Sequence, residues 1–393
     1  MLARVLMTLH LLGTESFHEF FPVLEIKNLS SIFSLPLELD ATIHQYWIRD
    51  SWFTKVFSEV GGAIVMTQNY SQLLVSDSVF SECYITGESG NLGYSLERGT
   101  IRYACGGAIF FWCDSHPISS LYVKRVCGYN CSARSSAGFD YEGYTRMSSG
   151  HFLFSFVPLE SSIKISDVSV QLCAPKVYGF AAFFLENGDI TVNNINLTKC
   201  CSLANSCLHF RPSKNATMQY ASLIRNNASL YSLHIRGKAS EYETNFISYL
   251  NFVSNSIIEN IYAQIVSNDE ASTKFFSCVF QNNSGHLFDR QNGNLYIFDC
   301  QIDSHSFTRS LPVYHNIVAF QKTLLINHYG SALCVTPIPP PTDDGSQGNI
   351  PPTPPQSIPL TPTECQFSQA EQLNIFPISK IVSILIFEFT IIT

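Results

Sequence analysis

The chain has 393 residues, of which 46% are hydrophobic and only 14% are charged, and its formal net charge is −8. A chain of this length and apolar content can bury a sizeable core, and its 30 Phe and 18 Tyr residues provide much of the bulk. Lys and Arg are too few and too scattered to form the basic surface that binds nucleic acid, so we expect no nucleic-acid partner.

The N-terminal residues are compatible with two interpretations. Arg4 precedes a short apolar stretch, residues 5–12, and small residues follow it, which is close to a minimal signal peptide. Residues 1–19 are therefore either a signal peptide or an N-terminal cap. Residues 20–58 are rich in Trp and Phe but show no repeat, and we expect them to cover the open end of a repeat array.

A nine-residue frame recurs seven times between Val75 and Asn283. It has mainly apolar residues at its first, fourth and sixth positions and ends in Cys or Asn at its ninth. The copies are residues 75–83, 123–131, 165–173, 192–200, 218–226, 247–255 and 275–283. The last five copies end 27, 26, 29 and 28 residues apart, a step that suits one coil of a parallel β-helix.

The interior of the frame favours strands. Positions four and six alternate with mostly polar residues, which is the pattern of a half-buried strand, and position eight is expected to face solvent. Asn side chains stacked at position nine can hydrogen-bond from coil to coil, and buried Cys can occupy the same stack as a compact hydrophobe.

A second recurrent motif precedes several frames. It is Gly61-Gly-Ala-Ile64 and Gly106-Gly-Ala-Ile109, with a degenerate copy at 179–184. Each copy lies 21 to 25 residues before the closing Cys of a frame, so we expect an earlier strand of the same coil, with glycine at a tight bend. The sequence therefore predicts an all-β fold, a parallel β-helix solenoid of about ten coils over residues 20–335. The family resemblance given below implies that this is a right-handed parallel β-helix.

The composition changes after this domain. Residues 336–365 are rich in Pro, which prevents ladder pairing and favours a disordered, extended stalk. Residues 366–393 form a tail that ends in thirteen mostly apolar residues, about 20 Å as a helix against a hydrocarbon core near 30 Å. We favour a truncated membrane anchor, with a lipid-anchor signal or a β-rich tail as alternatives.

The cysteine count of 13 is odd, and the spacing shows no Cys-x-x-Cys motif. Disulfides in an oxidising compartment are one interpretation, with Cys127–Cys131 and Cys201–Cys207 as the nearest pairs. The alternative is a metal site formed by Cys105, Cys113, Cys127 and His116. Because no paired spacing supports it, we expect no metal and no other cofactor.

The sequence contains seven sequons for N-glycosylation, at Asn28, Asn69, Asn130, Asn196, Asn215, Asn227 and Asn282. Asn130 and Asn282 stand at frame position eight and Asn196 at position five, and all three are expected to face outward. A secreted chain could carry glycans there.

An enzymatic alternative needs clustered carboxylates. Asp77 and Asp167 both stand at frame position three, and Arg125 and Asn194 occupy the same column. Because of the long sequence gaps, we expect the two aspartates to lie several coils apart. Other acidic residues form no recognisable set: Asp140, Glu142, Asp299, Asp303, Asp343 and Asp344. The histidines have no Ser or Cys partner at a known spacing: His116, His151, His209, His286 and His315. We expect no catalytic residues.

The Gly-Gly-Ala-Ile motif, together with Phe-x-x-Asn at 252–255 and 280–283, resembles the repeat pair of the polymorphic membrane proteins. These are pectin-lyase-like β-helix surface proteins of certain bacteria, and parasitic protists have similar proteins. The resemblance covers roughly residues 60–300, although several frames lack the full pattern and no outer-membrane barrel follows. It implies an adhesin-like role at the cell surface.

We therefore expect a non-catalytic binding scaffold that is secreted or displayed at the cell surface, with a membrane tether at its C-terminus. Its partner would be a surface protein or a glycan, contacted by the lateral face or by inserted loops at 84–105 and 132–150. The alternative is a degenerate polysaccharide lyase or glycoside hydrolase of the same fold.

Overall fold

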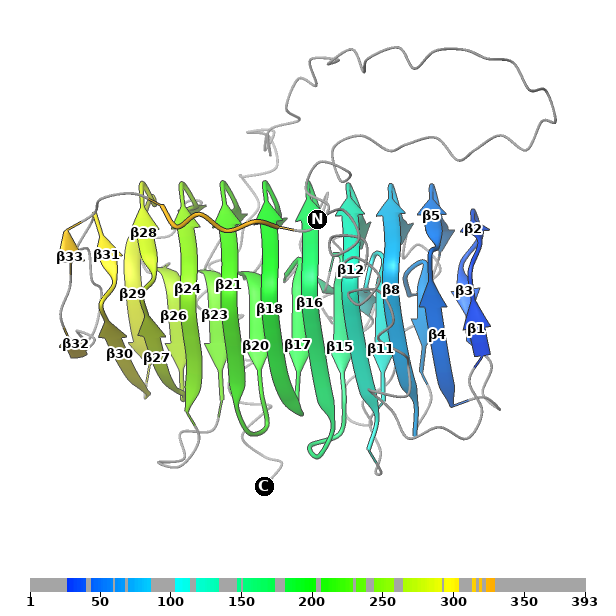
Figure 1. Ribbon diagram of the computed structural model, residues 1–393, viewed down its shortest axis with the longest axis horizontal. Coiled ribbons are helices and arrows are strands. Elements are labelled where there is room, and N and C mark those ends of the chain that lie inside the picture. Colours follow the sequence, from blue (N-terminus) through cyan, green and yellow to red (C-terminus); the bar gives the residue numbers. More distant parts are fainter. Residues whose placement is uncertain are drawn as a thin grey trace, which may run out of the picture. The chain divides into compact units, whose positions relative to one another are not determined.

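The computed structural model describes most of the region between residues 27 and 328 (Figure 1). The described ranges are 27–39, 44–58, 61–67, 70–85, 103–113, 118–133, 147–149, 151–173, 181–202, 206–228, 231–237, 244–257, 264–291, 293–303, 313–315, 318–319 and 323–328. The chain divides into two units, Met1–Thr342 and Asp343–Thr393, and every described residue belongs to the first. The predicted leader, proline-rich stalk and tail lie outside the described residues.

The regular secondary structure of the described residues is entirely β-strand. The main path of the long sheet is β1 (Lys27–Leu29), β4 (Gln45–Arg49), β8 (Gln72–Ser81), β12 (Ser120–Tyr129), β16 (Ser162–Gln171), β18 (Asp189–Thr198), β21 (Ala216–Ile224), β24 (Asn245–Val253), β27 (Ser272–Phe276), β30 (Asn294–Phe298) and β32 (Val313–His315). Shorter strands extend this sheet: β2 (Ile32–Phe33), β5 (Trp52–Thr54), β28 (Val279–Gln281), β31 (Gln301–Ile302) and β33 (Val318–Ala319).

A second sheet stands opposite and contains β3 (Leu37–Glu38), β7 (Ile64–Met66), β11 (Ile109–Trp112), β15 (Leu153–Phe156), β17 (Phe183–Glu186), β20 (Ser206–Arg211), β23 (Tyr231–Arg236), β26 (Gln264–Asp269) and β29 (His286–Gln291). Three small sheets complete the coils: β6 (Phe57–Ser58), β9 (Tyr84–Ile85) and β13 (Ser132–Ala133); β19 (Cys201–Ser202), β22 (Asn227–Ala228) and β25 (Ser256–Ile257); and β10 (Tyr103–Cys105) with β14 (Met147–Ser149).

The predicted parallel β-helix is confirmed. Each coil contributes a strand to the long sheet and one to the second sheet, and equivalent strands of successive coils pair in parallel and in register (Figure 1). The apolar side chains of both sheets meet in one continuous core. Since each coil buries its apolar side against its neighbours, stability depends on the stack rather than on any single coil.

The frame predicts the core faces correctly. The side chains at positions four, six and nine are buried in all seven copies, apart from the half-buried Asn283 and from Gly128, which has no side chain. Phe residues at position six stack across coils, with ring centroids of Phe53 and Phe80 4.7 Å apart and those of Phe33 and Phe53 also 4.7 Å apart. This stacking stabilises the fold in addition to the stabilisation that each ring gains from burial of its apolar surface.

The predicted N-terminal cap is wrong for the described part of residues 20–58. These residues form coils, in which β1 pairs with β4 and β4 pairs with β8. A frame does run from Ile48 to Val56, with Ser51 at position four and a buried Val at position nine in place of Cys or Asn. The Val at position nine conceals this frame in the sequence, because Ser also stands at position four of the copy at 75–83.

The stack at position nine is confirmed as a mixed ladder. Asn226 Nδ2 donates to Asn255 Oδ1, and Asn255 Nδ2 donates to Asn283 Oδ1, both at 3.1 Å. On earlier coils the same column holds buried cysteines, and the Cys131 main-chain N–H donates to Cys173 Sγ at 3.4 Å. Amide and thiol side chains therefore satisfy the same main-chain groups on successive coils.

The two glycines of each Gly-Gly-Ala-Ile motif have different roles. Gly61 and Gly106 have positive φ angles of 68° and 70°, which glycine adopts without steric cost. A Cβ on Gly62 would lie 2.1 Å from the Gly106 carbonyl oxygen, and one on Gly107 would lie 2.1 Å from the His151 carbonyl oxygen. The second glycine is therefore required because the backbone of the next coil passes too close for a side chain.

Candidate functional site

The outer side of the long sheet, here called the lateral face, carries one column at frame position three. Strand register places residues 50, 77, 125, 167, 194, 220, 249, 277 and 299 on successive coils. All nine have left-handed backbone conformations, with φ between 47° and 55°. The long sheet therefore kinks at the same place in each of these coils.

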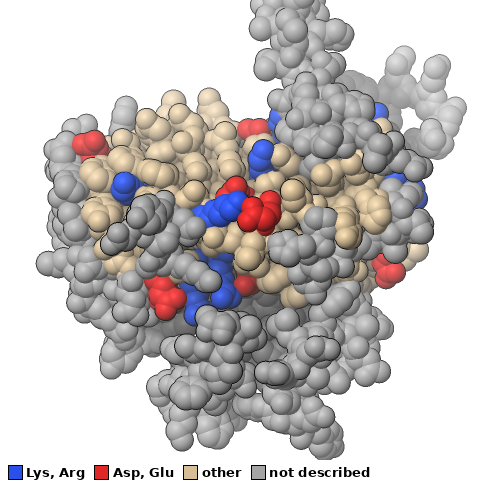
Figure 2. All heavy atoms as spheres, turned by 90° about the horizontal axis from the view of Figure 1, so that it is seen from below, with Lys and Arg blue, Asp and Glu red and all other residues tan. Residues whose placement is uncertain are grey.

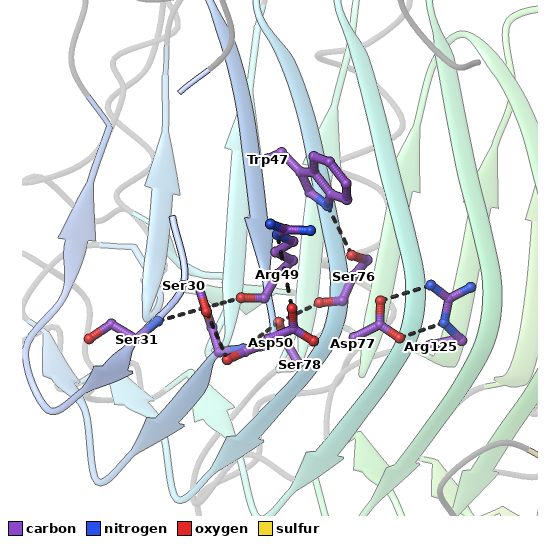
Figure 3. Close-up of polar contacts among 10 residues, drawn as sticks. Ser30, Ser31, Trp47, Arg49, Asp50, Ser76, Asp77, Ser78 and Arg125 are labelled. Atoms are coloured by element: carbon purple, nitrogen blue, oxygen red, sulfur yellow. Dashed lines mark hydrogen bonds and ion pairs between the residues drawn. The ribbon is translucent and has the colours of Figure 1, made fainter. Parts of the chain in front are cut away.

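The N-terminal part of this column is the charged ladder, which we define as Asp50, Asp77, Arg125, Asp167 and Asn194. Arg125 Nη2 donates to Asp77 Oδ2 at 2.8 Å, and its Nε donates to the other carboxylate oxygen (Figure 3). Asn194 Nδ2 donates to Asp167 Oδ1 at 2.8 Å. Both of these carboxylates thus accept hydrogen bonds from a neighbour one coil away.

The arrangement corrects the expectation that Asp77 and Asp167 lie several coils apart. The coils of Asp77, Arg125 and Asp167 are consecutive, since β8, β12 and β16 are direct neighbours. The long sequence gaps are instead largely taken up by residues 86–102 and 134–146, which lie outside the described residues. The backbones at Asp77 and Asp167 are therefore roughly 10 Å apart along the stack.

Backbone conformation explains why Asp and Asn recur in this column. Asp and Asn tolerate the left-handed region better than other residues with a side chain, because their short polar groups can bond locally. Arg125 donates to both oxygens of Asp77, so this carboxylate has an ion-pair partner within the column itself. The ladder is thus accounted for as a structural column.

The C-terminal part of the lateral face carries the aromatic patch, defined as Tyr220, Phe246, Tyr249, Phe276, Tyr296 and Phe298. Tyr220, Phe246 and Tyr249 are 45%, 42% and 42% exposed. The rings of Tyr220 and Tyr249 stack at 5.0 Å, and those of Phe276 and Phe298 at 4.7 Å. Lys274 Nζ lies 5.5 Å from the centre of the Phe246 ring. This patch was not predicted from the sequence, although its aromatic residues recur at aligned frame positions.

Six of the seven outward residues at frame position five are buried, and Val79 is half-buried. Ser169, Asn196, Ser222 and Asn251 form a polar column, here called the polar track. Residues 323–328 cover it at β21 and β24, where Asn251 and Ser222 hydrogen-bond to this segment. Frame periodicity cannot reveal this cover, because the covering residues are far away in the chain.

The sequons differ in exposure. Asn28, Asn215 and Asn282 are exposed, and Asn130 and Asn227 are half-buried. The expectation that Asn196 faces solvent is wrong: it is 8% exposed, and its Oδ1 accepts a hydrogen bond from Thr198 Oγ1 at 2.9 Å. Asn69 lies outside the described residues.

The cysteines correct the predicted pairs. Cys127 and Cys201 each take part in a disulfide, whereas Cys131 and Cys207 have free thiols, so neither predicted pair, Cys127–Cys131 nor Cys201–Cys207, forms. A metal set that includes Cys127 is contradicted as well, because a disulfide sulfur is not a thiolate ligand. Burial raises the pKa of the Cys207 thiol well above its usual value, so that thiol is unreactive.

Among the residues that the structure describes, the remaining candidates form no catalytic grouping. Asp303 Oδ2 accepts a hydrogen bond from the Asn282 main chain at 2.6 Å, and Asp299 is an exposed residue of the kinked column. Asp140, Glu142, Asp343, Asp344 and His116 lie outside the described residues, as does the side chain of His315. Within the described ranges no three His, Cys, Asp or Glu side chains are placed to hold a metal ion. No helix in those ranges is long and apolar enough to cross a membrane.

Three buried histidines predict sensitivity to acid. Burial lowers the pKa of His151 and of His234 from 6.5 to about 3, and burial with the neighbouring His234 lowers that of His209. Each native pKa lies below the unfolded value, so the unfolded chain binds more protons and stability falls as pH drops from about 6.5 toward 3. Urea unfolding at several pH values should show this decline, and His151→Gln should flatten it. If the unfolding free energy of His151→Gln depended on pH as steeply as that of the unaltered protein, His151 would not be a source of the acid sensitivity.

Charged side chains of both signs are mixed on the side shown in Figure 2, where Lys and Arg lie beside Asp and Glu. Lys214 Nζ and Glu160 Oε2 are 2.7 Å apart, and Arg211 Nη1 and Glu186 Oε1 are also 2.7 Å apart. The described surface visible there therefore has no basic patch for nucleic acid.

Comparisons of this chain with protein-family models, curated proteins and solved structures find no match. The resemblance to the polymorphic membrane proteins thus rests on the short motifs and on a compatible fold.

Proposed function

We propose that this protein is a non-catalytic β-helix scaffold, secreted or displayed at the cell surface, whose lateral face binds a surface protein or a glycan. The observation that carries this proposal is the aromatic patch. Its rings project from aligned outward positions on the coils of β21, β24, β27 and β30, and three of them are more than 40% exposed. Contiguous exposed apolar surface of this kind is typical of an interaction site.

The backbone at the patch supports a functional role for the rings. Tyr220 and Tyr249 adopt φ angles of 53° and 55° at positions where Asp or Asn would fit with less strain. Strained conformations of bulky residues persist where the surrounding structure imposes them, and they cluster at functional sites. Tyr side chains also combine apolar area with a hydroxyl group, which suits binding to proteins and to glycans.

An extracellular location is supported by two further observations. Cys127 and Cys201 each take part in a disulfide, and disulfides persist mainly in oxidising compartments. Three sequons, at Asn28, Asn215 and Asn282, are exposed and able to carry glycans. An adhesin-like role of the polymorphic-membrane-protein type is part of this proposal and follows from the motif resemblance.

The test is binding by the full chain, produced through a secretory pathway, to arrays of glycans and to intact host cells. Tyr220→Ser with Tyr249→Ser should reduce binding at least tenfold. The matched control is Tyr70→Ser, which removes another exposed tyrosine with positive φ outside the patch. Equal loss in the control, or no loss in the double variant, would contradict the patch as the binding surface.

The alternative, a degenerate carbohydrate-active enzyme, depends on the charged ladder. Asp77 and Asp167 flank Arg125 on consecutive coils, which places two carboxylates beside a basic residue. Asp167→Asn should leave binding unchanged if the scaffold proposal holds. Measurable cleavage of a polysaccharide that Asp167→Asn abolishes would favour the enzyme instead.

A further inference from the structure

The segment 323–328, here called the strap, crosses the outside of the long sheet after the last coil (orange in Figure 1). Its side chains alternate: Leu324, Ile326 and His328 are half-buried, and those between them are exposed, with Leu325 95% exposed. The strap is therefore extended, with one side against the sheet.

Asn251 on β24 holds the strap by its main chain. The Leu324 N–H donates to Asn251 Oδ1 at 2.8 Å, and Asn251 Nδ2 donates to the Leu324 carbonyl oxygen at 2.8 Å. One side-chain amide thus bonds to both polar groups of a single residue, as a neighbouring strand would. Such a contact depends on the backbone of the strap and not on which side chain residue 324 carries.

A second contact lies one coil further from the C-terminal end of the solenoid. His328 Nε2 and Ser222 Oγ on β21 are 2.8 Å apart, and Asn251 Nδ2 also lies 3.4 Å from Ser222 Oγ. These contacts join residues 73 and 106 positions apart in the chain. The strap therefore reaches back from the coil of β32 and β33, past β30 and β27, to β24 and β21.

We propose that the strap is a latch that holds the terminal coils of the solenoid closed. The last coils have a neighbour on one side only, so they should open first, and opening should spread inward. Because the strap is covalently continuous with the end of the solenoid and bound to coils further inside, the terminal coils cannot separate freely until the strap detaches. The latch needs no partner to operate.

The test is hydrogen exchange of the full chain, followed by mass spectrometry. Asn251→Leu keeps a side chain of similar size but loses both bonds to Leu324, so exchange at the strap should rise at least tenfold. If the strap is a latch, exchange in β30 and β31 should rise at least threefold as well. Ser222→Ala loses the contact with His328 and the longer one with Asn251 Nδ2 but keeps both Asn251 bonds to Leu324, so it should produce smaller increases at both places.

The matched control is Gln219→Ala, which changes an exposed residue of β21 three positions before Ser222. It should leave exchange unchanged at the strap and in the terminal coils. Faster exchange at the strap alone, with β30 and β31 unaffected, would overturn the latch. The same conclusion would follow if the strap of the unaltered protein exchanged as fast as an unstructured peptide.

Discussion

Replacing Gly107 with alanine is expected to destabilise the protein by roughly 3 kcal/mol, or to prevent folding. The new Cβ would lie 2.1 Å from the His151 carbonyl oxygen and 2.8 Å from the Ser132 carbonyl carbon. Both are main-chain atoms of neighbouring coils. The clash can therefore be removed only if the coils shift apart, because no change of side-chain rotamer moves these atoms. Chemical denaturation followed by circular dichroism measures the loss.

Gly237→Ala is the matched control for this substitution. A Cβ at Gly237 would meet Ala271 Cβ at 3.6 Å, which is ordinary van der Waals contact. Alanine there should be neutral or stabilise by about 0.5 kcal/mol, because it restricts the unfolded chain. Equal denaturation midpoints for Gly107→Ala and Gly237→Ala would contradict the close approach of the coils.

Asn255→Ala is expected to destabilise the protein by about 4 kcal/mol. Asn255 Oδ1 accepts a bond from the Asn226 main-chain N–H at 3.0 Å, and its Nδ2 donates to the Leu223 carbonyl oxygen at 2.8 Å. Alanine would leave both of these main-chain groups buried without a partner, and it would also break the ladder to Asn226 and Asn283. Thermal and urea unfolding of the purified variant measure the effect.

Asn255→Cys is the matched variant, because cysteine already fills this column on earlier coils. There the Cys131 N–H donates to Cys173 Sγ at 3.4 Å, and Cys200 Sγ lies 3.9 Å from the Val170 carbonyl oxygen. A thiol can thus contact both the main-chain N–H and the carbonyl oxygen that the amide bonds, but more weakly. The loss of unfolding free energy in Asn255→Cys should therefore be about half that in Asn255→Ala. A cysteine variant as unstable as the alanine variant would show that thiol and amide are not interchangeable in the stack.

Short-range periodicity is sufficient to predict the coils of this protein. Each frame alternates with period two and repeats at nearly constant spacing, so its buried positions follow from the pleat of a strand. The failures occur where one residue departs from the frame. Val56 replaces Cys or Asn in an early coil, and the coil that contains Cys300 follows Cys278 after only 22 residues.

The candidate site was only partly predictable. Asp77, Arg125, Asp167 and Asn194 were correctly aligned in one column. Their predicted coil spacing was wrong, because β8, β12 and β16 are direct neighbours despite the long stretches of sequence between them. The burial of Asn196 and the strap contacts could not be predicted. The strap contacts join residues 73 and 106 positions apart, and no local sequence pattern indicates where that segment packs.

Glycan mapping of the full chain expressed in eukaryotic cells tests the central claim most directly, because it examines location and fold together. The account predicts a protein that is labelled on intact cells or secreted, loses mass on treatment with a glycan-removing enzyme, and carries glycans at Asn28, Asn215 and Asn282 but not at the buried Asn196. An intracellular protein without glycans, or a folded protein with a glycan on Asn196, would contradict it.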